Sequence, residues 1–305
     1  MKLIKMAYLV PTLLAAPVFA QPNSNYTYLA LGDSIPFGMN ATLVLPYSTV
    51  APKPSEFIGY PEALAAANGL LQSNKEVNAS CPGETSASFL DTSEPDNGCN
   101  FPHLQPPAPQ VPPFKTTYGL HTKYTEAQMA FALTQLQTNK HINLVTLQIG
   151  ANDILLALPA LEACGTDTAC QTSVLTPVLS VYAGNLGQIL AGIRLNGQYE
   201  GTLILVTYYS PLTALNSVTQ ALNTTMTQVA TQFALETHTP SILIADGYDA
   251  FQLASALSNH DACQAGLLIR LPAGQYTATP CDIHPSPIGR DLLAAVVELA
   301  IWTRH

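Results

Sequence analysis

The sequence predicts an α/β fold with a mainly parallel, five-stranded sheet. Short runs that are nearly continuous in apolar residues recur along the chain, as expected for strands buried on both faces. Between them lie segments with apolar residues at spacings of three and four, which is typical of helices. This alternation favours parallel strands with helices on both faces of one sheet. The expected strands are 26–31, 143–149, 202–208 and 241–246, with a weaker one at 75–80.

Helical periodicity predicts helices over 61–71, 125–137, 175–194 and 215–233. A last helix is expected to begin after Ser286, whose hydroxyl suits the N-cap position and is followed by a proline.

Two stretches, 36–58 and 91–124, follow neither period, and the second contains "QPPAPQVPPF". They are either surface excursions or walls of a substrate pocket, because long loops at a ligand-binding edge are often functional.

The N-terminus has the pattern of a secretory signal peptide. Lys2 and Lys5 precede a short apolar run, and Val18 and Ala20 occupy the positions where a signal peptidase favours small residues. We expect a signal peptide at 1–20, cleavage near Ala20 and a single domain at 21–305, which would be secreted or periplasmic. An uncleaved anchor is the alternative, although the run is short for a membrane span.

Composition limits the partners. Apolar residues make up 48% of the chain, enough for a sizeable core, and charged residues only 10%. A net charge of -9 argues against nucleic acid and against attraction to anionic membranes. We expect a monomer with no nucleic-acid partner and no stable membrane insertion.

The six cysteines fall into three pairs that are close in sequence. No C-x-x-C occurs, and no histidine stands at zinc-finger spacing from a cysteine pair, so a metal site is not expected. Disulfides are favoured in an exported protein. The expected bonds are Cys81–Cys99, Cys164–Cys170 and Cys263–Cys281.

The sequence contains a candidate nucleophile, Ser34, and three residues that could assist it. An unactivated hydroxyl needs a base, a group that orients the base, and donors for an oxyanion. Ser34 follows the first strand in "LGDS", Gly83 follows the 75–80 strand in "CPGETS", and Asn152 follows the 143–149 strand in "GAND". His284 precedes the last helix in "DIHPSPIG". The carboxyl ends of parallel strands share one edge, where ligands bind, so the three loops should converge there.

These four blocks, in this order and over almost the whole mature chain, resemble the GDSL, or SGNH, hydrolase family. The resemblance implies a three-layer α/β/α, flavodoxin-like fold and hydrolysis of carboxylic acyl esters without a cofactor. It makes Ser34 the nucleophile and His284 the base. It places the oxyanion among the Ser34 N–H, the Gly83 N–H and the Asn152 side chain. The G-x-S-x-G elbow of the α/β-hydrolases is absent.

One position departs from the family pattern. The family's acid lies three residues before the histidine, where this chain has Cys281, and Asp282 lies two before His284. Alternate residues of an extended segment point to the same side, so Asp282 can reach the imidazole. The Cys281 main-chain carbonyl is the alternative acceptor, and Asp282 would then only cap the last helix. We favour Asp282 as the third catalytic residue.

The expected function is that of a secreted esterase or lipase acting on a small-molecule or lipid ester. A carbohydrate esterase or deacetylase could use the same residues, and an inactive secreted binding protein could keep the fold. Two further acids are expected to be structural: Asp33 to fix the turn at Ser34, and Asp153 to hold the loop that carries Asn152.

Overall fold

The computed structural model describes residues 27–71, 75–103, 112–272 and 280–303. The expected signal peptide and its cleavage site lie outside these residues, as does most of the proline-rich stretch.

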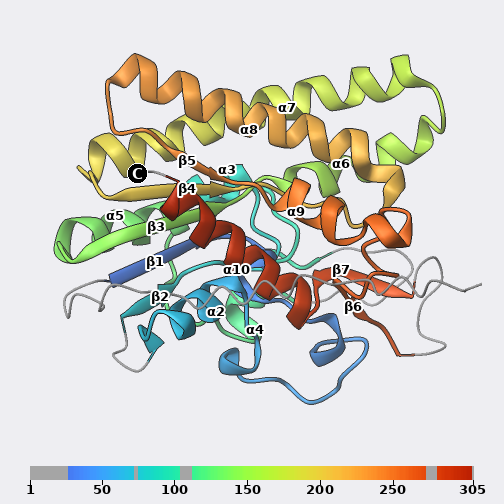
Figure 1. Cartoon of the computed structure of the whole chain (residues 1–305), viewed down its shortest axis with the longest axis horizontal. Helices are drawn as coiled ribbons and strands as arrows, with labels where there is room; N and C mark the ends of the chain where they lie inside the picture. Colours follow the sequence, from blue (N-terminus) through green and yellow to red (C-terminus); the bar gives the residue numbers. More distant parts are fainter. Residues whose placement is uncertain (1–26, 72–74, 104–111, 273–279, 304–305) are drawn as a thin grey trace, which may run out of the picture.

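The core is one five-stranded sheet in which every pair of neighbouring strands is parallel (Figure 1). The strand order is β2-β1-β3-β4-β5, and all five strands were predicted. Strand β1, which lies between β2 and the central strand β3, has six consecutive buried residues, and the sequence there is accordingly an almost unbroken apolar run. The bounds are β1 Thr27–Gly32, β2 Glu76–Asn78, β3 Ile142–Gln148, β4 Thr202–Val206 and β5 Leu243–Ala245.

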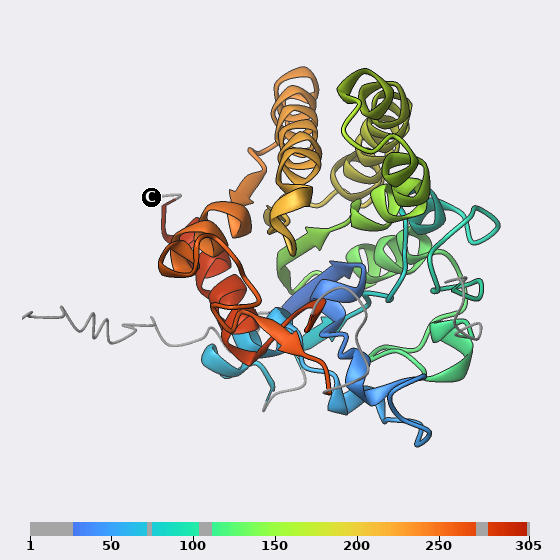
Figure 2. The ribbon, with the colours of Figure 1, turned by 90° about the vertical axis from the view of Figure 1, so that its right-hand side faces the viewer.

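Helices cover both faces of the sheet, which confirms the three-layer fold (Figure 2). One layer holds α2 Tyr60–Ala67, α9 Gly247–Ala254 and α10 Pro287–Trp302. The other holds α3 Ser86–Leu90, α5 Gln128–Thr138, α6 Ala151–Ala163, α7 Thr168–Ala191 and α8 Asn216–Thr237.

Helix ends follow from capping. The Ser286 side chain accepts a hydrogen bond from Gly289 N at 3.3 Å, so α10 begins where the sequence predicts. Helix α7 begins seven residues before the predicted start at 175, because the Asp167 carboxylate accepts from the N–H groups of Ala169 and Cys170. The sequence analysis did not predict α3, α6 or α9.

A small antiparallel pair, β6 Leu268–Arg270 with β7 Cys281–Pro285, lies outside the main sheet and was not predicted. The shorter elements are α1 Ser34–Phe37, α4 Phe114–Thr117, the 3-10 turns Ala41–Leu43, Pro54–Glu56, Thr213–Leu215 and Ala256–Ser258, and the π-helical turn Gly192–Asn196 that continues α7.

The two aperiodic stretches pack on each other through aromatic rings. The ring of Phe37 lies 5.0 Å from that of Phe57 and 5.1 Å from that of Phe114, centroid to centroid. All three rings are buried. The described parts of these stretches are therefore fixed by a small core of their own, which their lack of helical or strand period could not indicate.

The strand order places the first two chemical motifs side by side. From β1 the chain runs to β2 on one side, and it then returns to β3 on the other. Such a reversal leaves a crevice at the carboxyl ends of the two strands. Ser34 follows β1 and Asn152 follows β3, so both lie at this crevice.

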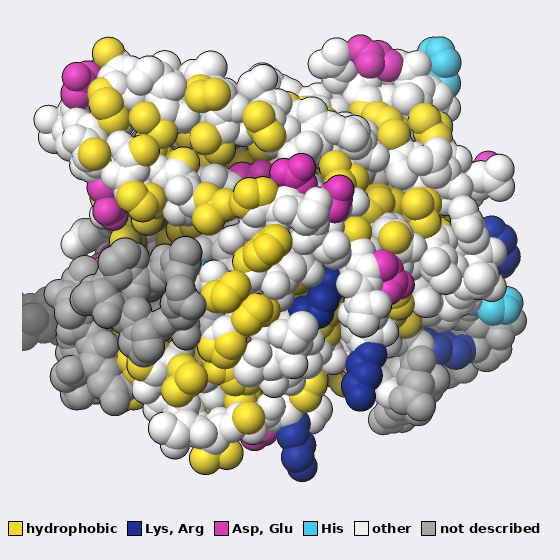
Figure 3. Space-filling model, turned by 180° about the vertical axis from the view of Figure 1, so that it is seen from behind, with side chains coloured by type: hydrophobic (Ala, Val, Ile, Leu, Met, Phe, Trp, Pro, Cys, Tyr) yellow, Lys and Arg dark blue, Asp and Glu magenta, His cyan; other side chains and the backbone are white. Residues whose placement is uncertain are grey.

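Positive charge is scarce in the layer of α6, α7 and α8. Arg194 is the only lysine or arginine between residues 141 and 269, and it is buried. From behind, lysine and arginine side chains lie at mid-height and below, away from the upper helices (Figure 3). Among the described residues, Thr168–Asn196 is long and apolar enough to cross a membrane by length and composition, with a mean hydropathy of 1.3. In this fold it packs against α6 and α8.

Candidate active site

Ser34 is the first residue of α1 and directly follows the turn that ends β1. Gly32 has φ +137°, and a Cβ there would lie 2.0 Å from the Gln148 carbonyl oxygen, so the turn requires glycine. Asp33 caps α1 by accepting a hydrogen bond from Ile35 N at 3.0 Å. The Ser34 hydroxyl is thereby held at the carboxyl edge of the sheet.

Asp33 is a buried carboxylate with two partners. Besides Ile35 N, it accepts a hydrogen bond of 2.5 Å from the Tyr208 hydroxyl. Burial raises the pKa of Asp33 to about 6, although both hydrogen bonds act to lower the pKa. These contacts fit the turn-fixing role expected from the sequence.

Gln128 also holds this turn, and the sequence analysis missed it. Its side-chain oxygen accepts from Gly32 N at 2.6 Å, and its amide nitrogen donates to Gly32 O at 3.0 Å. The residue is fully buried at the start of α5. The only signal in the sequence is a lone polar residue on the apolar face of a predicted helix.

A chain of hydrogen bonds joins Ser34, His284 and Asp282. His284 Nε2 lies 2.9 Å from the Ser34 hydroxyl oxygen, and Nδ1 lies 2.7 Å from an Asp282 carboxylate oxygen. Asp282 and His284 are alternate residues of β7, so their side chains point to the same side. The carboxylate, and not the Cys281 carbonyl, occupies the position beside Nδ1 in this structure.

The two charged partners shift each other's pKa. Burial lowers the pKa of His284, but the charge and hydrogen bond of Asp282 outweigh burial and raise it above the usual value. Burial likewise raises the pKa of Asp282, and the interaction with His284 outweighs burial and lowers it. Their side chains are only 11% and 12% exposed. This pairing stabilises an imidazolium at His284.

The strands β6 and β7 form a hairpin that carries His284, and this hairpin is fixed from two sides. A disulfide joins Cys281, the first residue of β7, to Cys263. The Tyr209 hydroxyl donates a 2.6 Å hydrogen bond to the Ile283 carbonyl, and its ring stacks on Phe251 at 4.1 Å. The other two cysteine pairs are also bonded as expected from their spacing, Cys81–Cys99 and Cys164–Cys170.

Gly83 and Asn152 are held beside each other by Asn97. Gly83 has φ +87°, and a Cβ there would lie 2.3 Å from the Asn97 carbonyl oxygen. The Asn152 amide donates to Glu84 O and its oxygen accepts from the Asn97 amide, both at 3.0 Å. The contact with Glu84 uses one of the two amide hydrogens of Asn152. Asn152 and Ser34 line the same pocket. Sequence reasoning missed Asn97, which stands in no motif.

Asp153 holds the segment that carries Asn152, as expected, and it does so through Ser86. Its carboxylate accepts from the N–H and the hydroxyl of Ser86, at 2.9 and 2.5 Å. Ser86 is the first residue of α3 and follows the Gly83 turn, whereas Asp153 lies in the first turn of α6. Asp153 therefore ties the Gly83 block to the Asn152 block, a tertiary contact that a one-dimensional pattern cannot reveal.

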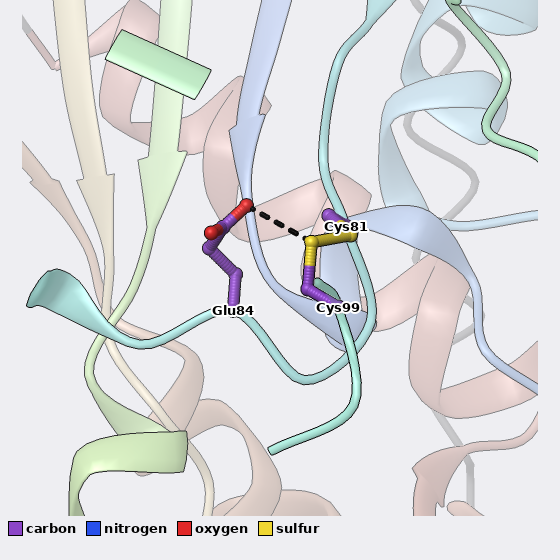
Figure 4. A group of neighbouring side chains, drawn as sticks. All are labelled: Cys81, Glu84 and Cys99. Atoms are coloured by element: carbon purple, nitrogen blue, oxygen red, sulfur yellow. Dashed lines mark hydrogen bonds between the residues drawn. A yellow bond between two sulfur atoms is a disulfide. The ribbon is translucent and has the colours of Figure 1, made fainter. Parts of the chain in front are cut away.

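Under the Gly83 turn lies a buried acid, Glu84, beside the Cys81–Cys99 disulfide (Figure 4). It accepts hydrogen bonds from Ser88 at 2.7 Å and from Gln128 at 3.1 Å. Burial raises the pKa of Glu84 to about 7. The donor atoms of Cys81, Glu84 and Cys99 lie within 4.8 Å of one another. Both sulfurs are in the disulfide, so neither can act as a thiolate ligand for a metal.

A pocket opens beside Ser34 and is lined in part by residues of α6 and α8. Its lining includes Asn152, Leu158, Tyr208 and Leu222, and it encloses about 670 Å³ when its open mouth is counted. None of its lining comes from the described parts of 36–58 or 91–124. The sequence left open whether these stretches are surface excursions or walls of a substrate pocket. Their described residues form no wall of this pocket.

Comparisons with known proteins agree with the fold and with the family resemblance. The sequence profile of the GDSL-like Lipase/Acylhydrolase family matches residues 30–292. The structure is similar to phospholipase A1 from Streptomyces albidoflavus NA297, with 16% identity and a TM-score of 0.52 over 90% of this chain and 99% of that one.

It is also similar to an extracellular lipase from Streptomyces rimosus, with 15% identity and a TM-score of 0.50 over 90% of this chain and 99% of that one. Among curated proteins, none matches significantly. The profile match covers most of the sequence, and it confirms the resemblance drawn from the four motifs: the chain belongs to the GDSL-like lipase/acylhydrolase family.

Proposed function

We propose that the protein is a secreted serine hydrolase that cleaves carboxylic esters through an acyl-enzyme on Ser34. The observation that carries this proposal is the continuous hydrogen-bond chain from Ser34 through His284 to Asp282, at the wall of an apolar pocket. Each member has the chemistry its position requires: a nucleophile, a base and a group that orients the base.

In the first half-reaction, His284 Nε2 takes the proton of the Ser34 hydroxyl as its oxygen attacks the ester carbonyl. Negative charge then develops on the carbonyl oxygen. The Ser34 N–H, the Gly83 N–H and the Asn152 amide stabilise that oxyanion. The Asp282 carboxylate stabilises the imidazolium, which returns its proton to the departing alcohol.

In the second half-reaction, water replaces the alcohol. His284 takes a proton from the water as it attacks the acyl-Ser34 ester, and the same oxyanion site is used again. Collapse of this intermediate releases the carboxylic acid and returns the proton from His284 to Ser34. These steps need only the side chains and N–H groups named here.

Substitution of the nucleophile tests this proposal. Ser34→Ala should lower kcat for p-nitrophenyl butyrate by at least about ten-thousandfold, since a triad without its nucleophile loses several orders of magnitude. Ser93→Ala, at an exposed serine, is the matched control. Near-normal turnover by purified Ser34→Ala would rule out the serine mechanism. A wild-type protein that hydrolyses no ester and reacts with no serine-directed phosphonate would be a binding protein instead.

Export is part of the proposal. Three disulfides among six cysteines are compatible with an oxidising compartment, and residues 1–20 have the composition of a signal peptide. N-terminal sequencing of protein collected outside the cytoplasm should then begin at Gln21. We further propose that the mature enzyme is a monomer.

A further inference from the structure

Building on the proposed function, we propose that the enzyme binds the acyl chain of its substrate in the groove between α6 and α8. We infer a preference for medium-length aliphatic acyl groups, of about eight carbons, over acetyl groups.

The groove begins at Ser34 and continues along two helices. Ile154, Leu155 and Leu158 of α6 line it at spacings of three and four, which places them on neighbouring positions of one helix face. Val218 and Leu222 of α8 line the opposite side.

The inner end of the groove is near the carboxyl edge of the sheet. A Cβ on Gly150, the residue before α6, would lie 3.1 Å from the Leu222 side chain. Asn152 lies within the first turn of α6, and Leu158 is the lining residue of α6 farthest along the helix from it. Leu158 therefore lines the outer part of the groove.

The length of this wall sets the expected chain length. Six residues separate Asn152 from Leu158, which corresponds to about 9 Å along a helix. An extended alkyl chain advances by about 1.25 Å per carbon–carbon bond, so about seven bonds, those of an octanoyl group, span the same distance. An acetyl group would contact only the residues nearest Ser34.

The lining offers few polar groups to a sugar. None of the lining residues is charged. The hydroxyl of Tyr208 is bonded to Asp33, and the hydroxyl of Tyr209 to the Ile283 carbonyl. Thr219 adds one hydroxyl to the lining. A sugar ring placed here would still lose most of its hydrogen bonds to water without replacing them, whereas an alkyl chain would lose none. This distinguishes the two substrate classes that the sequence left open.

The preference can be expressed as a rate ratio. Each methylene buried in an apolar site contributes about fourfold, and six methylenes separate acetyl from octanoyl. Allowing for incomplete burial, kcat/KM for the octanoyl ester should exceed that for the acetyl ester by roughly a hundredfold to a thousandfold.

The experiment compares two series of soluble monomeric substrates. The first is p-nitrophenyl esters from acetyl to dodecanoyl, which vary only the acyl group. The second is acetate esters of alcohols from methyl to octyl, which vary only the alcohol. The expected result is a maximum near octanoyl in the first series and a weak dependence in the second. A flat acyl series, or a steep rise confined to the alcohol series, would overturn the proposal.

Variants then locate the chain. Leu158→Trp should lower the octanoyl-to-acetyl ratio of kcat/KM at least tenfold by filling the outer groove. Leu156→Trp is the matched control, because Leu156 is 46% exposed on the same helix and does not line the groove. Val218→Trp, on the opposite wall, provides a second test if Leu158→Trp does not fold. Equal ratios in wild type and both groove variants would contradict the assignment.

Labelling of Ser34 and hydrolysis of acetyl esters test the proposed function, whereas the effect of chain length tests the acyl groove. If a small phosphonate labels Ser34 and acetyl esters are hydrolysed, but chain length has no effect, only the acyl-groove assignment fails. If neither labelling nor hydrolysis occurs, the proposed function itself fails.

Discussion

The two halves of the candidate active site are built in different ways. Ser34 and Asn152 follow the adjacent strands β1 and β3, and the loop of each is bonded to the Gly83 block, the first through Gln128 and the second through Asp153. His284 lies on β7, in a two-stranded hairpin outside the main sheet. That hairpin is held by the Cys263–Cys281 disulfide and by the hydrogen bond from Tyr209 to Ile283.

This difference predicts different responses to damage. The serine half depends on the sheet and on buried polar groups. Changes there should therefore weaken the stabilisation of the oxyanion and also lower the stability of the whole domain. The histidine half depends on few local links, so changes there should affect catalysis before they affect the sheet.

Asp282→Asn tests the histidine half. It should lower kcat about ten-thousandfold, as a related change does in a serine protease. The Asp282 charge raises the pKa of His284, so the acid limb of the pH–rate profile should also move to lower pH in the variant. Asp291→Asn, at an exposed residue, is the control. A loss of tenfold or less would mean that the Cys281 carbonyl, and not the Asp282 carboxylate, orients His284.

Asn152→Ala tests the serine half. It should lower kcat by roughly a hundredfold to a thousandfold with a smaller change in KM, because the amide binds the oxyanion more strongly than the ground-state carbonyl. The variant should also lose thermal stability, since Asn152 is buried and bonded to Glu84 and Asn97. A change confined to KM would mean that Asn152 only binds substrate.

Removal of the hairpin disulfide should separate activity from folding. With Cys263→Ser and Cys281→Ser together, kcat/KM for the acetyl ester should fall about tenfold while far-ultraviolet circular dichroism keeps its shape. Replacing Cys164 and Cys170, at the α6–α7 turn, is the matched control and should change kcat/KM less than twofold. Equal effects of the two double variants would refute the special role of the hairpin.

Glu84→Gln should have the smallest effect on catalysis and a measurable one on stability. Burial raises the Glu84 pKa from 4.5 to about 7, so the folded state holds a proton that the unfolded state has lost in this interval. Glu84 therefore makes the free energy of unfolding decrease as pH rises from 4.5 to 7. The variant should gain about 2 to 4 °C in Tm at pH 8 and nothing at pH 4.5. An equal gain at both pH values, or a gain in the exposed Glu94→Gln control, would contradict this.

The contrast between the halves also explains what the sequence could predict. The sheet and most of its helices follow from periodicity, and the motif order identifies the four family blocks. Asp282 as the neighbour of His284 follows from the alternation of side chains along an extended segment. The hairpin itself was missed, because β6 has only three residues and pairs across a long connection.

The contacts that hold the site together could not be predicted in the same way. Gln128, Asn97 and the Asp153–Ser86 pair act across 44 to 96 positions of sequence, and none has a local pattern. The groove between α6 and α8 depends on how two helices pack, and α6 was not recognised as a helix. Such features arise from tertiary packing, which propensity and spacing describe only indirectly.

The proposed mechanism depends on the activation of Ser34 as a nucleophile by His284. Its most direct test is the rate and site of reaction with a small serine-directed phosphonate, followed by intact mass and peptide mapping. Our account predicts one adduct per chain, on the peptide that contains Ser34, and a rate at least about a thousandfold slower in His284→Ala. An adduct at another residue, or the same rate of Ser34 labelling in wild type and His284→Ala, would contradict it.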